Sequence, residues 1–317
     1  MRLVVLLVVA GSLRAQDASV LQRFDYDAHA SLDIRESGVE RRGGVAIHDI
    51  SYASPKGGRV PAYLVVPQGK SRFAAVIWGH WYWSNSAMRN RKEFLDEAVV
   101  LANSGVVSLL TDGPVARPGH VESKDPLDEQ QIIDQLQQIA DMRRGADLLL
   151  ARKDVDPNRL GYVGHSYNAT VGAFLSGIDH RFKAFVLMAG GLSDDVFRQS
   201  EDYQQARQKI GAERFDAFDR KYAWLDPGKF VSHAAPAFVF LQYGTQEKFL
   251  NAERARQFAA IVSDPKRLGL YDAPHSLNAE ARRDRIAFLT ERLGFKPPAA
   301  AAIASVPDLV QPPDPNP

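Results

Sequence analysis

Short apolar runs alternate with longer amphipathic stretches along most of the chain. Eight segments are rich in β-branched and aromatic residues, which is typical of strands. We expect these strands at 45–53, 59–66, 73–78, 106–110, 159–163, 184–188, 237–242 and 267–271. The first two are joined by turn-forming residues at 54–58, which predicts an antiparallel hairpin.

Helical patterns fill the intervals between the later strands. We expect helices at 89–102, 128–150, 169–177, 252–262 and 279–293, and a mostly helical insert at 192–235. Regular strand–helix alternation implies parallel strands joined by right-handed crossovers, with helices on both faces of the sheet. The pattern therefore predicts an α/β fold with a mostly parallel central sheet of about eight strands.

The two ends of the chain differ in character from its middle. Residues 1–15 begin with a cation, continue as a short apolar run and end in small residues, which predicts a secretory signal peptide. Residues 16–40 are polar and predict an arm on the surface of a folded domain at 41–296. The Pro- and Ala-rich segment 297–317 predicts a disordered tail. We expect a secreted or bacterial periplasmic protein with no stable membrane insertion after cleavage.

Composition excludes several kinds of partner and chemistry. The 317 residues include 39 Lys and Arg against 38 Asp and Glu, so no basic field would attract nucleic acid. The chain has no Cys, which excludes disulfides, a thiolate nucleophile and cysteine metal sites. No Gly-x-Gly-x-x-Gly fingerprint is present, and we expect neither a cofactor nor a metal.

Candidate chemistry begins at residues 160–169, LGYVGHSYNA. A predicted strand runs into Gly-x-Ser and directly on into a predicted helix, which is the context of a nucleophile elbow, and Ser166 is the candidate nucleophile. Gly164 leaves room for the sharp turn. Asn168 stands two residues after the serine, where Gly is usual, so its bulk must find space against a neighbouring strand. This substitution leaves a non-catalytic binding module as one alternative.

A serine hydroxyl needs a base to take its proton, and the base needs an acid to orient it. His275 is the histidine that follows the last predicted strand, in a loop introduced by Pro274. Glu247 lies three residues after Gly244, in the loop that follows the preceding strand. The other carboxylates that suit this role are Asp194, Asp195 and Asp272.

An oxyanion hole requires two backbone N–H groups, one from the residue after the nucleophile and one from the loop after an earlier strand. Tyr167 supplies the first. The second falls in residues 78–83, WGHWYW, where we expect His80, with Trp81 next. The aromatic side chains of Trp81 and Tyr82 are candidates for the substrate pocket.

These segments, taken together, resemble the dienelactone hydrolase branch of the α/β-hydrolase superfamily. They are also similar to the catalytic domains of prolyl-oligopeptidase-type peptidases and to bacterial acetyl esterases. The resemblance rests on Ile77–His80, Leu110–Gly113, Asp154–Arg159, Gly164–Ser166, Gly244–Glu247 and Pro274-His275. It spans roughly residues 41–296 in the expected order.

The chain departs from that branch at several positions. Dienelactone hydrolases use a cysteine nucleophile, which this sequence lacks, and Trp78 replaces the histidine usual before the oxyanion glycine. Glu247 stands where Asp is usual. The resemblance implies a serine hydrolase of small carboxylic esters. Because no propeller or other large gating domain is present, we favour esters over the alternative, a peptidase acting on short peptides.

Overall fold

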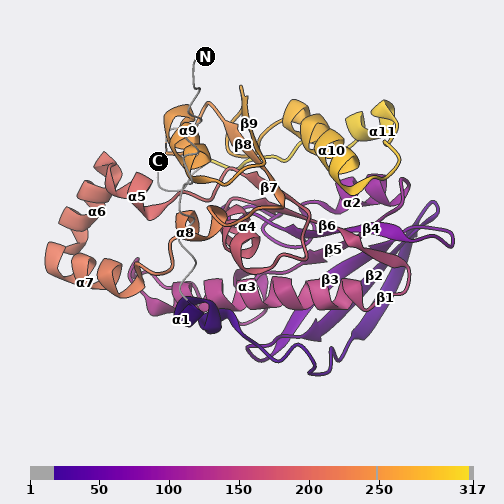
Figure 1. Ribbon diagram of the computed structural model, residues 1–317, viewed down its shortest axis with the longest axis horizontal. Coiled ribbons are helices and arrows are strands. Elements are labelled where there is room, and N and C mark those ends of the chain that lie inside the picture. The colour runs from indigo at the N-terminus through magenta and orange to yellow at the C-terminus, as the bar shows by residue number, and fades with distance from the viewer. Residues whose placement is uncertain (1–17, 248, 314–317) are drawn as a thin grey trace, which may run out of the picture.

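A computed structural model describes residues 18–247 and 249–313, and within them the chain forms a nine-stranded sheet with helices on both faces (Figure 1). The three antiparallel strands at one side are β1 (Arg35–Arg42), β2 (Val45–Ala53) and β3 (Arg59–Val66). The parallel part follows in the order β5 (Val106–Thr111), β4 (Phe73–Gly79), β6 (Val155–His165), β7 (Ala184–Met188), β8 (Phe238–Gly244) and β9 (Lys266–Tyr271). The predicted α/β fold is confirmed.

Two sets of helices cover the sheet. One face is packed by α3 (Glu129–Leu150), α4 (Tyr167–Ile178), α8 (Pro227–Val231) and α9 (Ala252–Ile261). The other face is packed by α2 (Leu95–Ala102) and α10 (Ala279–Leu293). The insert between β7 and β8 adds α5 (Asp194–Arg198), α6 (Glu201–Ile210) and α7 (Ala212–Tyr222). Short helical turns complete the fold at α1 (Ala18–Leu21), η1 (Gln22–Phe24) and η2 (Pro114–Ala116).

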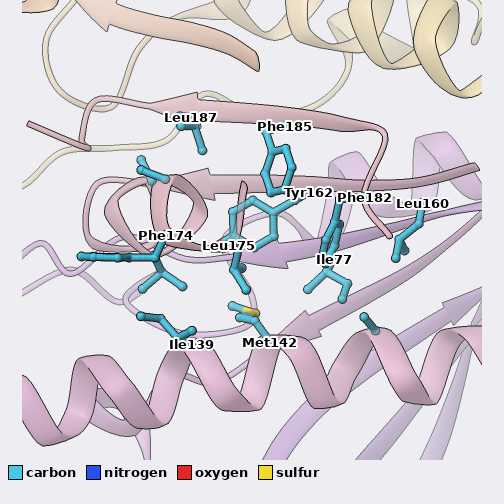
Figure 2. Close-up of a cluster of buried hydrophobic side chains, with 14 of the residues drawn as sticks. Ile77, Ile139, Met142, Leu160, Tyr162, Phe174, Leu175, Phe182, Phe185 and Leu187 are labelled. Carbon is cyan, nitrogen blue, oxygen red and sulfur yellow. The ribbon is translucent and has the colours of Figure 1, made fainter. Parts of the chain in front are cut away.

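The core consists of one hydrophobic cluster on each face of the sheet. Along β4, Ala75 and Ile77 face the cluster under α3 and α4, whereas Val76 and Trp78 face the cluster under α2 and α10. Both faces of this strand are buried, which explains its continuous apolar run. Figure 2 shows the first cluster, in which side chains of α3 and α4 meet those of the central strands.

Two segments differ from the sequence expectation. The surface arm contains β1, an exposed edge strand paired with β2, which has no alternation of apolar residues to reveal it. Residues 297–313 of the supposedly disordered tail are placed on the domain, with a short helix α11 (Ala300–Ala304). Trp83 Nε1–H donates to the carbonyl of Pro312 (2.9 Å), and Arg282 donates to that of Pro307 (3.1 Å). Hydrogen bonds from Trp83 and Arg282 therefore hold the tail on the domain, and the composition of the tail does not reveal them.

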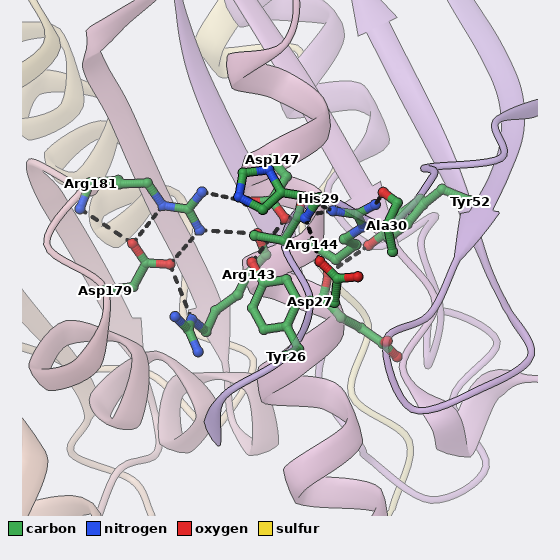
Figure 3. A network of polar contacts seen from close by, with 12 residues as sticks. Tyr26, Asp27, His29, Ala30, Tyr52, Arg143, Arg144, Asp147, Asp179 and Arg181 are labelled. Carbon is green, nitrogen blue, oxygen red and sulfur yellow. Dashed lines mark hydrogen bonds and ion pairs between the residues drawn. The ribbon is translucent and has the colours of Figure 1, made fainter. Parts of the chain in front are cut away.

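The segment before β1 lies against α3 through a polar network (Figure 3). Tyr26 O–H donates to Asp147 (2.9 Å), and Arg143 donates to the carbonyl of Phe24 (2.6 Å). Arg181 joins Asp147 (2.5 Å) and thereby ties the β6–β7 side of the domain to the same helix.

The predicted signal peptide, residues 1–15, lies outside the described part of the chain. Among residues 18–247 and 249–313, no helix combines the length and the apolar character needed to cross a membrane.

A substitution of Phe174 on α4 tests the packing of the first hydrophobic cluster. The ring of Phe174 is fully buried and packs on Phe24 and Phe230, with ring centroids 6.4 and 4.9 Å away. Phe174→Ala should lower the free energy of unfolding by about 3–5 kcal/mol because it leaves a cavity. Urea denaturation measures this, with Phe174→Leu as the milder control. A loss of less than about 1 kcal/mol would contradict this packing.

Candidate active site

Ser166 lies on the sharp turn between β6 and α4. Its backbone angles are φ 54° and ψ −112°, a conformation that residues with side chains rarely adopt. Its N–H donates to the carbonyl of Met188 on β7 (2.7 Å). Glycines permit the close approach of the backbone, since a Cβ on Gly164 would come within 2.2 Å of the Asn168 carbonyl, and one on Gly190 within 2.2 Å of the Ser166 carbonyl.

His275 and Glu247 lie in contact beyond the ends of β9 and β8. Nδ1 of His275 is 2.7 Å from Oε1 of Glu247, and both side chains are largely buried. The N–H of Gln246 donates to the carbonyl of Ala273 (3.1 Å), which holds the two loops together. Because a carboxylate only accepts, the tautomer that suits this contact has the hydrogen on Nδ1 and the lone pair on Nε2. Within the described residues neither Nδ1 nor Nε2 of His275 makes a hydrogen bond of good geometry, so the pairing with Glu247 is a close contact and Nε2 is free to accept a proton.

The loop that carries His275 is attached to the nucleophile turn through His165, the neighbour of Ser166. Nε2–H of His165 donates to the carbonyl of His275 (2.9 Å), and the two rings stack with centroids 5.3 Å apart. Trp83 packs against the His275 ring as well, at 5.0 Å. Ser166 and His275 therefore lie on adjoining loops at the carboxyl ends of the parallel strands.

The other carboxylates considered for the acid have different partners. Asp194 begins α5 and lies 3.8 Å from Arg198, and burial raises the pKa of Asp194 to about 7. Asp195 pairs with the same arginine (2.9 Å) on the surface. Asp272 accepts from the amide of Gln246 (2.9 Å). None of these three carboxylates pairs with the His275 ring.

The peptide group between His80 and Trp81 is hydrogen-bonded at both ends. The N–H of Trp81 donates to Oε2 of Glu93 (2.5 Å), and the carbonyl of His80 accepts from Nδ2 of Asn168 (2.6 Å). Trp81 N–H is therefore already occupied. Two other backbone N–H groups, those of His80 and of Tyr167 at the start of α4, donate to no acceptor among the described residues.

Asn168 is accommodated because of Gly79. A Cβ on Gly79 would come within 2.5 Å of the Asn168 side chain, so the absence of that atom creates the space. Oδ1 of Asn168 accepts from Nε2 of Gln138 on α3 (2.9 Å). The side chain is fully buried with both polar atoms bonded, and it fixes the His80 carbonyl.

The aromatic residues after β4 divide into buried and pocket-lining side chains. Trp81 was expected in the substrate pocket, but it is fully buried and stacks on His165 at 5.2 Å, because its loop turns inward to Glu93. The His80 imidazole is also internal, since Nδ1–H donates to the Trp81 carbonyl (2.6 Å) and Nε2 accepts from Gly113 N–H (2.9 Å). Burial lowers the pKa of His80.

Two cavities adjoin the start of α4. The first, of about 300 Å³, lies between the insert and the body of the domain and includes Thr170, whose N–H donates to the Ser166 carbonyl (3.2 Å). Its other walls are largely aromatic and apolar, with Leu192, Phe197, Tyr203, Phe215, Phe218 and Tyr222 among them. The second, of about 170 Å³, is lined by Tyr82 and Tyr167, whose ring centroids are 6.0 Å apart.

No family model matches the chain, and no curated protein matches it in sequence. Solved structures do match it in shape. An acetyl xylan esterase from Paenibacillus sp. R4 is 17% identical, with a TM-score of 0.69 over 88% of this chain and 96% of that one. An acetyl xylan esterase from Thermoanaerobacterium sp. JW/SL YS485 is 14% identical, with a TM-score of 0.67 over 86% and 92%.

A glucuronoyl esterase from Solibacter usitatus is also similar, at 16% identity and a TM-score of 0.58 over 86% of this chain and 91% of that one. The chain has the α/β-hydrolase fold. In this fold the nucleophile, acid and base follow one another along the chain and meet at the carboxyl ends of the strands. Ser166, Glu247 and His275 occur in that order here.

Three residues that lie around Ser166 have no role that the sequence predicts. Glu93 and Gln138 come from segments without a recognisable motif, and only the folded chain brings them to the turn at Ser166. His165 lies between Gly164 and Ser166, and its position in the sequence alone predicts no role. Among the described residues, no group of three or more His, Asp and Glu side chains is arranged to hold a metal ion.

The pH dependence of hydrolysis tests the environment of His275. Burial lowers the pKa of His275 below its ordinary value of about 6.5, although Glu247 opposes this shift. A general base works when it is neutral, so activity should be lost only as the pH falls below about 6.5 and should be flat from about pH 7 to 8. The measurement is kcat/KM for p-nitrophenyl acetate against pH. An acidic limb centred above pH 7 would contradict this environment.

Proposed function

We propose that this protein is a serine hydrolase that cleaves carboxylic esters, with Ser166 as nucleophile, His275 as general base and Glu247 as the acid that orients it. The observation that carries the proposal is the 2.7 Å contact between His275 and Glu247 on a loop joined to the strained turn at Ser166. The signal-like pattern of residues 1–15 supports a protein that acts after export.

The proposed reaction has two halves. The Ser166 hydroxyl attacks the ester carbonyl while Nε2 of His275 takes its proton, and the N–H groups of Tyr167 and His80 stabilise the oxyanion. The tetrahedral intermediate then expels the alcohol, which receives its proton from His275, and leaves an acyl-enzyme. In the second half a water gives one proton to His275 while its oxygen attacks the acyl carbonyl, the bond to Ser166 Oγ breaks as Oγ takes that proton back from His275, and the carboxylic acid leaves. Glu247 stabilises the imidazolium at each stage.

One observation favours esters as the substrates. The similar structures named above are two acetyl xylan esterases and a glucuronoyl esterase, and their likeness spans most of this chain. In this proposal the two cavities beside α4 receive the two sides of a small ester. In this proposal the insert of α5, α6 and α7 roofs the larger cavity and limits the size of the acyl group.

Labelling with a fluorophosphonate probe tests the nucleophile. The wild-type protein should be labelled, and Ser166→Ala should lose both labelling and ester hydrolysis, because no other group can take over the attack. We expect a fall in kcat of at least about 10³-fold. Equal labelling of both proteins would remove Ser166 from the mechanism. Faster cleavage of aminoacyl amides than of matched esters would instead favour a peptidase.

A substitution of Leu192 tests whether the larger cavity receives the acyl chain. Leu192→Trp would fill part of the space of about 300 Å³, so kcat/KM for hexanoate and benzoate esters should fall by about 10-fold or more while acetate changes by less than about 2-fold. Leu192→Met, which conserves volume, is the matched control. A uniform loss across all acyl groups would show that this cavity does not receive the acyl chain.

A further inference from the structure

A second buried contact between a histidine and a glutamate lies beside the proposed triad. Nδ1 of His165 is 2.6 Å from Oε1 of Glu93, and the two side chains are 0% and 2% exposed. Removing such polar groups from water is unfavourable unless hydrogen bonds of good geometry compensate for it. Neither residue takes part in the proposed reaction.

The hydrogen bonds of this pair reach three separate loops. Oε2 of Glu93 accepts from the N–H of Trp81, in the loop after β4. Oε1 contacts His165, at the end of β6 immediately before the nucleophile. Nε2–H of His165 donates to the carbonyl of His275, in the loop after β9. One carboxylate and one imidazole therefore connect the oxyanion loop, the nucleophile turn and the loop of the general base.

Ring stacking adds to the same connection. The rings of Trp81 and His165 are 5.2 Å apart and inclined by 19°, and those of His165 and His275 are 5.3 Å apart and inclined by 25°. The imidazole of His275 thus lies on the face of His165. A displacement of this face would move the His275 ring relative to Ser166.

We propose that Glu93 and His165 are positioning residues, which hold the His275 imidazole and the His80–Trp81 peptide in one fixed arrangement around Ser166. This inference rests on the proposed function, because the pair has this role only if Ser166 and His275 react together. Both side chains are buried, so neither is exposed to a substrate. Their effect is on the geometry of the reacting groups, where a shift of about 1 Å can lower the rate by about 10²-fold.

The pair also contributes to the electrostatics of the base. The ionisable groups that act on His275 are Glu247, His165 and Glu93. Burial lowers the pKa of His275 most, and His165 lowers it further, whereas the two carboxylates raise it. Replacing His165 by neutral Gln removes one lowering effect and retains both carboxylates. The acidic limb of kcat/KM should then move to higher pH, which loss of structural support alone would not produce.

The test compares Glu93→Gln, His165→Gln and the double variant with wild type on p-nitrophenyl acetate. Each single variant should lower kcat by about 10- to 100-fold with KM within about 2-fold, because positioning affects the reaction step rather than binding. The double variant should be no slower than the slower single variant, since the two residues act as a unit. His165→Gln keeps an amide donor toward the His275 carbonyl, so it serves if Glu93→Gln does not fold.

Glu97 provides the matched control. It is also 2% exposed, lies on α2 shortly after Glu93 in the chain, and accepts from Nε of Arg285 (2.8 Å). Glu97→Gln removes a buried carboxylate that is paired with Arg285 and makes no hydrogen bond to the three loops, so it should lower the melting temperature but leave kcat within about 2-fold of wild type.

Three results would overturn the positioning role. They are a wild-type kcat in folded Glu93→Gln, losses that multiply in the double variant, and an acidic limb that does not move in His165→Gln. These failures differ from failure of the proposed function, which would show as ester hydrolysis retained by Ser166→Ala. A wild-type kcat in Glu93→Gln together with an inactive Ser166→Ala would reject the positioning role alone.

Discussion

Holding Ser166 in a left-handed backbone conformation is unfavourable by about 1–3 kcal/mol, so the surrounding structure must keep the turn in place. The central strand β6 provides this support, because it is paired on both sides, with β4 and with β7. The hydrogen bond from Ser166 N–H to Met188 continues the pairing with β7 past the end of the strand, and Gly164 and Gly190 allow the backbone segments to approach. The loops after β4, β8 and β9 then gather around the end of β6, and every candidate catalytic group is positioned relative to that turn.

Much of this arrangement could be predicted from the sequence because its signals are local. The alternation of short apolar runs with amphipathic segments predicts a parallel sheet. A strand that is buried on both faces, such as β4, has a continuous apolar run in the sequence. The Gly-x-Ser segment between a strand and a helix located the turn. The position of Glu247 in the loop after β8 favoured it over Asp194, Asp195 and Asp272, and the structure places its carboxylate 2.7 Å from the His275 ring.

What the sequence did not reveal depends on contacts between distant segments. Strand β1 forms by pairing with β2 at the sheet edge, and its own residues are exposed and polar. Residues 306–312 are held by donors that Arg282 and Trp83 supply from elsewhere. Trp81 looked like a pocket residue because an aromatic side chain near a site suits a pocket wall or a core equally well, and its burial follows from Glu93, more than ten residues further along the chain. Space for Asn168 likewise depends on Gly79, on a different strand.

The central claim is that one turn, one imidazole and two backbone amides converge on a single reacting carbon. A crystal structure of the protein after reaction with a phosphonate ester tests this most directly, because the phosphorus imitates the tetrahedral carbon. The account predicts phosphorus bonded to Ser166 Oγ, with one phosphonyl oxygen within about 3.1 Å of the N–H groups of Tyr167 and His80 and with Nε2 of His275 facing the leaving-group side. An adduct on another residue, or on Ser166 with its oxygen turned away from both amides, would contradict it.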